Sequence, residues 1–222
     1  MNRLFSSILL ISFCLCWHLG QTQDALPVRW GKIDQEQIDM TQCEFEPEAD
    51  VVILVDYGEW RPKNIATGSM AFRRHIRYKV LKESGTRIAN QEIKFLYEGQ
   101  TEKIISLQAQ TINWDNGKKQ LNKLGLKYLP EERLNEHWAR KTFTLREVKV
   151  GSIVEVSYEI ETVNSISLTP WYFQSEYPTM YSEVRLKNLL QGTHYLPATR
   201  GNPLPIAKKN RQWMAKNIPS VK

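Results

Sequence analysis

The sequence predicts an all-β fold, an antiparallel β-sandwich or open barrel with one or two short helices. Several segments alternate strictly between apolar and polar residues, turn signals separate them at regular spacing, and no stretch keeps a helical period. Alternate residues of a strand lie on the same face, so such alternation is typical of half-buried strands. Six or more of these segments joined by turns favour a sandwich or a barrel.

The first predicted elements are a short helix and two strands. Residues 30–40 are a candidate helix with Asp34 as its N-cap. The apolar run 51–57 is short and is followed by Gly58, which favours a buried strand over a helix. Residues 71–83 then alternate between two rows. The apolar row is Phe72, Ile76, Tyr78 and Val80, and the basic row on the opposite face is Arg73, His75, Arg77 and Lys79.

The middle of the chain adds more strands and a hairpin. Strands are expected around 93–97 and over 102–114, and Asn116-Gly117 follows directly. An Asn-Gly step between extended segments is the strongest short hairpin signal, because both central residues must accept positive φ. Residues 129–139 fit either a short helix or a polar loop, and another strand is expected at 142–146.

Residues 153–161 show the clearest alternation in the chain. Val154, Val156, Tyr158 and Ile160 form an apolar row, which we expect to be buried with the apolar row of 71–83. Glu155 and Glu159 lie on the other face, where we expect exposure to water. They are candidates for weak cross-strand pairs with Arg73, Arg77 and Lys79.

The N-terminal residues look like a targeting segment. Residues 1–22 carry Arg3 and then an apolar run, 8–19, which is shorter than the roughly 20 residues that cross a bilayer. This predicts a cleaved secretory signal. A lipoprotein signal using Cys14 or Cys16 is the alternative, although a bulky residue precedes each cysteine. No later run is long and apolar enough to predict a transmembrane helix.

The remaining chain is expected to contain the sandwich domain at 23–188. Residues 170–178 form an aromatic segment bounded by prolines, and 180–189 fits another strand. Residues 189–222 are rich in Pro, Gly, Lys and Asn, which indicates a final strand and a linker-like tail. Trp213 is expected to fold back onto the sandwich edge.

The net charge and the cysteine content limit the environments and partners that are possible for this chain. The formal net charge is +6, but the Lys and Arg residues are scattered, which argues against a nucleic-acid partner. Outside the signal, Cys43 is the only cysteine, so the predicted mature chain can form no internal disulfide. An exported protein of this size without disulfides fits the bacterial periplasm or cell envelope.

The cysteine and histidine residues give little support for a catalytic nucleophile or a metal site. Cys43 lies among acidic residues, which raise a thiol pKa, so it reads as an incidental buried thiol. His75, His137 and His194 form no close-spaced ligand pair. His75 is expected at the surface, and His137 is expected to pack beside Trp138. The sequence therefore predicts no metal ion, no cofactor and no catalytic residue.

Two pairs of glutamates are candidates for acid–base catalysis. Glu131-Glu132 and Glu155 with Glu159 could act as paired carboxylates, as in glycosidases. The pattern around Glu155 and Glu159 indicates a solvated face, which is the preferred interpretation.

The aromatic segment is the better lead to a function. Such side chains can stack on sugars or hold a peptide. The alternative is that alternate members close one end of the sandwich. The candidate ligand-contact residues are Trp171, Tyr172, Phe173 and Tyr177.

The order of segments resembles one known family. Its marks are the Ala49-Asp50 entry to the first strand, His75 in the second, the turn at 115–118, the strand at 150–159 and the terminal "WMAKNIPSVK". Together they resemble the bacterial exported domain of unknown function found N-terminal to transglutaminase-like domains. The resemblance implies a β-sandwich of unassigned function, joined to a papain-like catalytic domain in a longer chain, and offers no catalytic residues in this region.

The leading hypothesis is a non-catalytic exported module that binds or positions a substrate or partner for a transglutaminase-like domain. The alternative is a free-standing protein of the bacterial envelope that binds a glycan, a peptide or another protein. An enzyme acting by itself is the third hypothesis.

Overall fold

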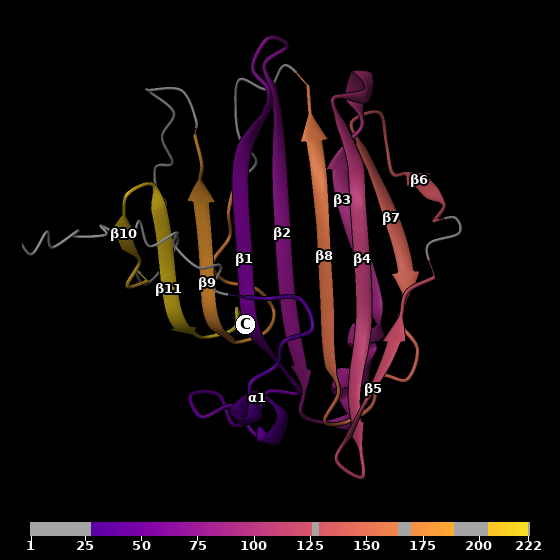
Figure 1. The fold of residues 1–222 in the computed structure, drawn as a ribbon, viewed down its shortest axis with the longest axis vertical. Helices are drawn as coiled ribbons and strands as arrows, with labels where there is room; N and C mark the ends of the chain where they lie inside the picture. The colour runs from indigo at the N-terminus through magenta and orange to yellow at the C-terminus, as the bar shows by residue number, and fades with distance from the viewer. Residues whose placement is uncertain (1–27, 126–128, 164–169, 189–203, 222) are drawn as a thin grey trace, which may run out of the picture.

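A computed structural model describes residues 28–125, 129–163, 170–188 and 204–221. Within these ranges the chain forms eleven strands in two sheets, with one short α-helix and two 3₁₀ helices (Figure 1). The elements are α1 (Gln35–Asp39), β1 (Val51–Asn64), β2 (Ser69–Val80), η1 (Glu83–Ala89), β3 (Asn90–Leu96), η2 (Glu98–Gln100), β4 (Glu102–Asp115), β5 (Lys118–Lys123), β6 (Glu131–Arg133), β7 (Trp138–Thr144), β8 (Ile153–Thr162), β9 (Thr179–Leu186), β10 (Ala207–Lys209) and β11 (Gln212–Ile218).

The large sheet has the strand order β10-β11-β9-β1-β2-β8-β4-β5, and the small sheet has the order β3-β7-β6. Neither sheet closes into a barrel in the described ranges, so the predicted all-β sandwich with few helices is confirmed and the barrel alternative is not needed. One detail differs from the prediction, because β1 and β9 pair in parallel while every other pair is antiparallel. No helix in the described parts of the chain is long and apolar enough to cross a membrane.

The inner face of the large sheet packs against the small sheet and forms the main core. The predicted apolar rows of β2 and β8 meet there, because Ile76 lies opposite Val156 and Tyr78 opposite Val154 in the antiparallel register. Ile93 and Phe95 of β3 pack on them from the small sheet. The predicted joint burial is confirmed for Ile76, Val80, Val154, Val156 and Ile160, while Tyr78 and Tyr158 are half-buried against this core. Phe72 instead joins a separate cluster around Trp60 and Trp213.

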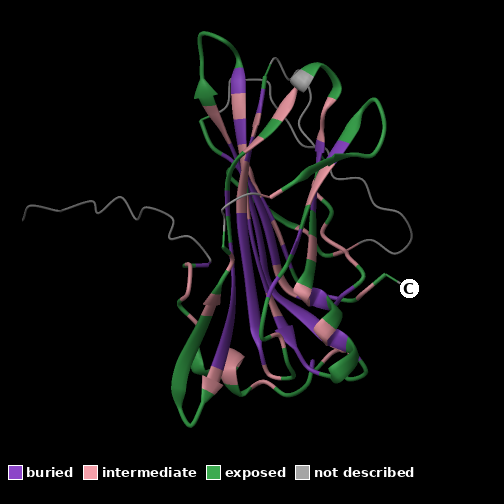
Figure 2. Ribbon diagram, turned by 90° about the vertical axis from the view of Figure 1, so that its right-hand side faces the viewer, coloured by how far each residue is buried: buried purple, intermediate pink, exposed green. Residues whose placement is uncertain are grey.

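The outer face of the large sheet is covered in part as well, by residues 28–49 (Figure 1). Figure 2 shows that the long strands are buried, in purple, over much of their length. Val28, Cys43 and Ala49 of this segment, hereafter the N-terminal cover, pack on Val52, Leu54, Val55, Tyr57, Ile112 and Ile153. The polar residues beneath this cover are therefore not solvated as predicted, whereas Arg73 on the same face is exposed. Glu155 is completely buried and His75 is 5% exposed, so the expected exposure of both was wrong. The Glu159 side chain is 16% exposed.

The predicted hairpin, helix and C-terminal strand are each present in the structure. The Asn-Gly hairpin joins β4 to β5 with φ of 48° at Asn116 and 74° at Gly117, as expected. The predicted helix occurs as α1, with Asp34 at its N-cap position. Residues 129–139 form no helix and contain β6. Trp213 is 4% exposed in β11, which pairs with β9 and confirms the expected fold-back.

The proposed domain limits remain predictions. The signal at 1–22 and the stretch 189–203 lie outside the described residues.

Candidate binding groove

A groove runs along the inner face of the large sheet, beside β3. One part, of about 350 Å³, has Trp60, Phe72, Tyr158 and Ile160 among its lining residues. The adjoining part, of about 390 Å³, is lined by Ile53, Ile76 and Tyr78 among others. The two parts adjoin at Arg74 and Glu92, which line both, and together they are called the aromatic groove hereafter. Each volume lies within the range of known ligand pockets.

Residues 170–177 form the wall opposite β3. Trp171 lies so close to the backbone of β1 that a Cβ added to Gly58 would meet its ring at 2.5 Å. Its indole Nε1 donates a hydrogen bond of 3.1 Å to the Ser182 hydroxyl of β9. Phe72 contacts the same ring edge-on at a centroid distance of 6.1 Å. Because Gly58 has no side chain, the Trp171 ring packs directly on the backbone of β1 in one defined position.

A half-buried ion pair lies where the two parts of the groove meet. Arg74 donates from Nε and Nη2 to the two carboxylate oxygens of Asp56, at 2.8 and 2.7 Å. Its guanidinium also lies 5.3 Å from the Trp171 ring centre. Burial opposes the charged form, but the Asp56 charge outweighs this and raises the pKa of Arg74. Arg74 therefore stays charged and links the groove floor to the Trp171 wall.

The structure brings three of the four predicted contact residues to the groove. Trp171 and Tyr172 line one part and Tyr177 the other. Tyr172 is 74% exposed, whereas Tyr177 is 6% exposed and packs edge-on against Tyr78. Phe173 instead packs in the cluster around Trp60. The segment therefore both closes the core and presents an aromatic surface, so each of the two sequence interpretations describes part of it.

Some groove residues were not singled out from the sequence. Trp138, which is 42% exposed, lies at the end of β7 and lines the groove. Trp60 lines the floor, and its indole Nε1 is buried without a hydrogen-bond partner in the described parts of the chain. Two-residue alternation places each side chain on a face, but it does not tell which face a second sheet leaves open. Trp138 was expected to pack with His137, which instead forms an ion pair of 2.9 Å with Glu98.

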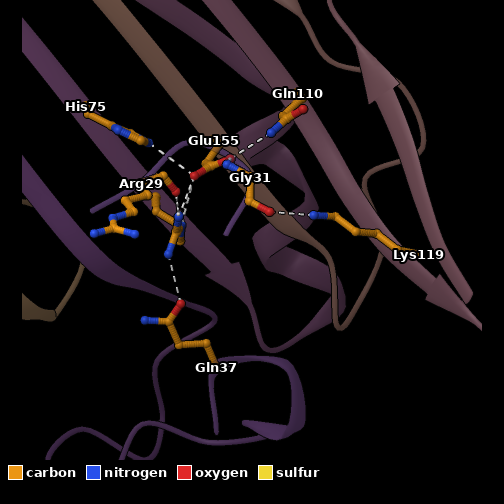
Figure 3. A network of polar contacts seen from close by, with 8 residues as sticks. Arg29, Gly31, Gln37, His75, Gln110, Lys119 and Glu155 are labelled. Carbon is orange, nitrogen blue, oxygen red and sulfur yellow. Dashed lines mark hydrogen bonds and ion pairs between the residues drawn. The ribbon is translucent and has the colours of Figure 1, made fainter. Parts of the chain in front are cut away.

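The outer face carries a second notable feature, a buried charge network centred on Glu155 (Figure 3). Arg77 donates to Glu155 Oε1 from Nη2 at 2.6 Å, and His75 Nε2 lies 3.1 Å from the same oxygen. On the other oxygen, Gln110 Nε2 donates at 2.7 Å and the Gly31 amide at 2.9 Å. Glu155 lies on β8 between β2 and β4, so the two neighbouring strands supply His75, Arg77 and Gln110 to its carboxylate.

This network attaches the N-terminal cover to the sheet. Besides the Gly31 amide, Arg77 donates to the Gln37 side chain and to the Arg29 carbonyl oxygen. Lys119 Nζ donates to the Gly31 carbonyl oxygen at 2.5 Å. Burial would raise the pKa of the Glu155 carboxyl, but the His75 hydrogen bond and the Arg77 charge lower it to about 2. A carboxylate with all of these donors is satisfied, which points to a structural role.

The comparisons with known proteins place the chain in a family. The sequence profile of DUF3857, a domain of unknown function with a solved structure, matches residues 66–222. The chain belongs to this family. No relative was found among curated proteins. The DUF3857 match extends from the β1–β2 turn through β11 and so covers most of both sheets.

Solved structures provide comparisons for the DUF3857 fold. A suspected protease from Parabacteroides distasonis ATCC 8503 is 15% identical, with a TM-score of 0.54, over 78% of this chain and 36% of that one. Yeast leukotriene A4 hydrolase with bestatin is 10% identical, with a TM-score of 0.35, over 87% of this chain and 30% of that one. An M1 zinc metallopeptidase from Deinococcus radiodurans is 8% identical, with a TM-score of 0.33, over 79% and 41%. The first supports the fold alone, and this chain spans well under half of each protein.

In the described parts of the chain, the other residues that were weighed as catalytic or metal-binding groups from the sequence do not line the groove. Cys43 is 2% exposed in the N-terminal cover, and burial raises the pKa of its thiol. Glu131 and Glu132 lie on the short strand β6, where each contacts a basic residue of β7. His194 lies outside the described residues. No group of three or more His, Cys, Asp or Glu side chains in the described ranges could hold a metal ion.

Proposed function

We propose that the domain is a non-catalytic binding module whose aromatic groove holds a ligand or partner. The observation that carries the proposal is the groove itself, a concave surface with an apolar floor, a Trp171 ring packed on β1 and an exposed Tyr172. Exposed aromatic side chains beside a pocket supply large contact areas at small conformational cost. The charged residues at its centre, Arg74 and Asp56, neutralise each other and so favour positioning over proton transfer.

The proposal includes a partner domain. In the family that the sequence resembles, a transglutaminase-like domain follows, and we propose that the groove presents a substrate or partner to such a domain. With residues 1–22 as a secretory signal, the module would work in the bacterial periplasm or cell envelope. The alternative is a free-standing glycan- or peptide-binding protein of the envelope, which the same groove would serve. Whether the reading frame continues past Lys222 into a transglutaminase-like domain distinguishes the two.

Binding assays on the purified domain test the groove. Immobilised glycans and extended synthetic peptides are screened against the wild type, then against Tyr172→Ala and Trp171→Ala. We expect both variants to keep the fold and to bind at least roughly tenfold more weakly, because an aromatic contact contributes more than 1 kcal/mol at a binding hot spot. A matched control is Trp114→Ala, which removes a half-buried Trp from the outer face. Equal binding by all four proteins would disprove a role for the groove.

A further inference from the structure

We propose that the occupant of the aromatic groove is an extended polypeptide segment that adds to the free edge of β3 as a further strand. This inference rests on the proposed function and specifies the chemistry of the ligand. It begins with the position of β3, which is the edge strand of the small sheet and pairs only with β7 in the described parts of the chain. An unpaired strand edge is a template for another backbone.

The hydrogen-bond register tells which backbone groups of β3 are directed to that edge. The Tyr97 amide donates to His137 and the Leu145 amide donates to Ala89, so the odd-numbered residues between them belong to hydrogen-bonded pairs with β7. In an antiparallel pair the intervening residues direct both N–H and C=O away from the partner. Glu92 and Lys94 are such residues.

Two further contacts confirm this alternation. The Leu96 amide donates to the Glu102 carboxylate, and the Asn90 amide donates to the Arg87 carbonyl oxygen. Both even-numbered amides thus bond to groups outside β7. The carbonyl oxygen of Asn90 and both backbone groups of Glu92 and Lys94 lie between these two points. At ~3.4 Å per residue, this edge matches a partner strand of about five residues.

The groove lies at the same edge. Asn90, Gln91 and Glu92 line one part of it, and Glu92, Ile93 and Lys94 line the other. The floor beneath is apolar and aromatic, with Phe72, Ile76 and Tyr78 from β2. A strand added to β3 would continue the small sheet, so every second side chain would point to this floor and the others to solvent. The small sheet would then cover more of the inner face.

The charges around the edge favour a peptide without a strong net charge. Glu92 forms ion pairs with Arg140 and Lys94, at 2.7 and 3.1 Å. Arg74 is paired with Asp56, and Arg87 lies 3.1 Å from the Asp50 carboxylate. Since these charges are matched within the domain, the complementary ligand offers backbone donors and acceptors and alternating apolar side chains. A glycan could stack on Tyr172, but it has no repeating amide groups to match the register of β3.

Isothermal titration with defined probes tests the inference. The probe is a synthetic peptide of alternating Val and Thr with Lys at each end. Two methylated versions carry methyl groups on one or the other set of alternate backbone nitrogens. Cellohexaose serves as the glycan probe. We expect the unmethylated peptide to bind and one of the methylated peptides not to bind. Amide exchange by NMR should show new protection at Glu92 and Lys94 on binding, while Ile93 and Phe95 are protected with or without peptide.

Two variants at one position separate backbone from side chain. Lys94→Pro removes an N–H that points away from β7, at an edge position where proline is tolerated. We expect it to weaken peptide binding by roughly tenfold or more, because one ladder hydrogen bond is lost and the added strand is displaced. Lys94→Ala removes the same side chain but keeps the N–H, so it should bind the peptide clearly more tightly than Lys94→Pro does. Should Lys94→Pro fail to fold, the methylated peptides and the exchange data give the answer.

The outcomes distinguish the inference from the proposed function. If the peptide binds Lys94→Pro as well as the wild type but binds Tyr172→Ala weakly, the groove binds ligand without strand addition, and the inference fails alone. Binding of cellohexaose and not of the peptide has the same consequence. If neither probe binds the wild type, and glycan and peptide screens find no other ligand, both the inference and the groove function are wrong.

Discussion

The two faces of the large sheet are both covered, but in different ways. On the outer face, the N-terminal cover encloses charged groups, and Glu155 is completely buried with Arg77 and His75. On the inner face, the small sheet covers the apolar rows but leaves the aromatic groove beside β3. Around Glu155 the outer face is therefore a buried, hydrogen-bonded layer, whereas the inner face combines a core with an accessible surface. Loss of a buried polar group on the outer face should therefore act mainly on stability, and loss of an exposed aromatic group in the groove mainly on binding.

The largest effect is expected from Glu155→Ala. The change leaves Arg77 and His75 buried without their carboxylate and detaches the Gly31 amide, so we expect a loss of about 3–5 kcal/mol in the free energy of unfolding. Urea unfolding measures it. Glu159→Ala is the matched control on the same strand face, because Glu159 pairs with the more exposed Arg61 and should cost only about 0–1 kcal/mol. Equal losses for the two would show that the layer around Glu155 is not buried.

The second prediction concerns pH. The pKa of Glu155 is about 2 in the folded protein and near its ordinary value of 4.5 when unfolded, so the folded state binds fewer protons between these values. Its contribution is fully present above pH 4.5 and is lost as the pH falls toward 2, by about 3 kcal/mol in total. Urea midpoints at several acidic pH values should fall more steeply for the wild type than for Glu155→Gln. Parallel curves would contradict this assignment.

A smaller loss is expected from Gly58→Ala on the inner face. The new Cβ would overlap the Trp171 ring at 2.5 Å, so the ring must leave its position, at a cost of about 1–3 kcal/mol. Trp fluorescence and peptide binding should both change. Gly125→Ala is the control, since an added Cβ there meets nothing within 4 Å. If Gly58→Ala binds ligand normally, the position of Trp171 does not matter for binding.

The smallest effect on stability is expected from Tyr172→Ala. The side chain is 74% exposed, so its removal should change the free energy of unfolding by less than about 0.5 kcal/mol. Ligand binding should nevertheless weaken, which would separate the binding surface from the core. A large loss of stability, measured by thermal unfolding, would mean that Tyr172 belongs to the packed part of its segment.

The strand faces could be predicted from the sequence because a strand repeats every two residues. Val156 and Glu155 do lie on opposite faces of β8, and Arg77 does lie opposite Glu155 on the neighbouring strand. What covers each face could not be predicted this way. The N-terminal cover has little regular periodicity, so nothing in its pattern showed that it would lie over Glu155 and His75 and turn a polar face into a buried network.

The same limit applies to the groove. Its aromatic wall was predicted from the composition of residues 170–178, since four aromatic residues between prolines are unusual in a loop. Its other wall, the edge of β3, depends on the order of strands in the small sheet, which arises from pairing between segments distant in the chain. Gly58 is the one local signal that could have placed Trp171, because a glycine inside a strand often marks a close approach.

The parallel pairing of β1 with β9 has a consequence for folding kinetics. Strand β1 begins at Val51 and lies in the middle of the large sheet, but one of its two neighbours begins only at Thr179. During synthesis on a ribosome, the apolar stretch 51–55 therefore has one unpaired edge until most of the chain has emerged. Folding dominated by such distant contacts is slow and exposes aggregation-prone edges. The apolar strand β1 is therefore at risk of pairing with another chain until β9 arrives to complete the sheet.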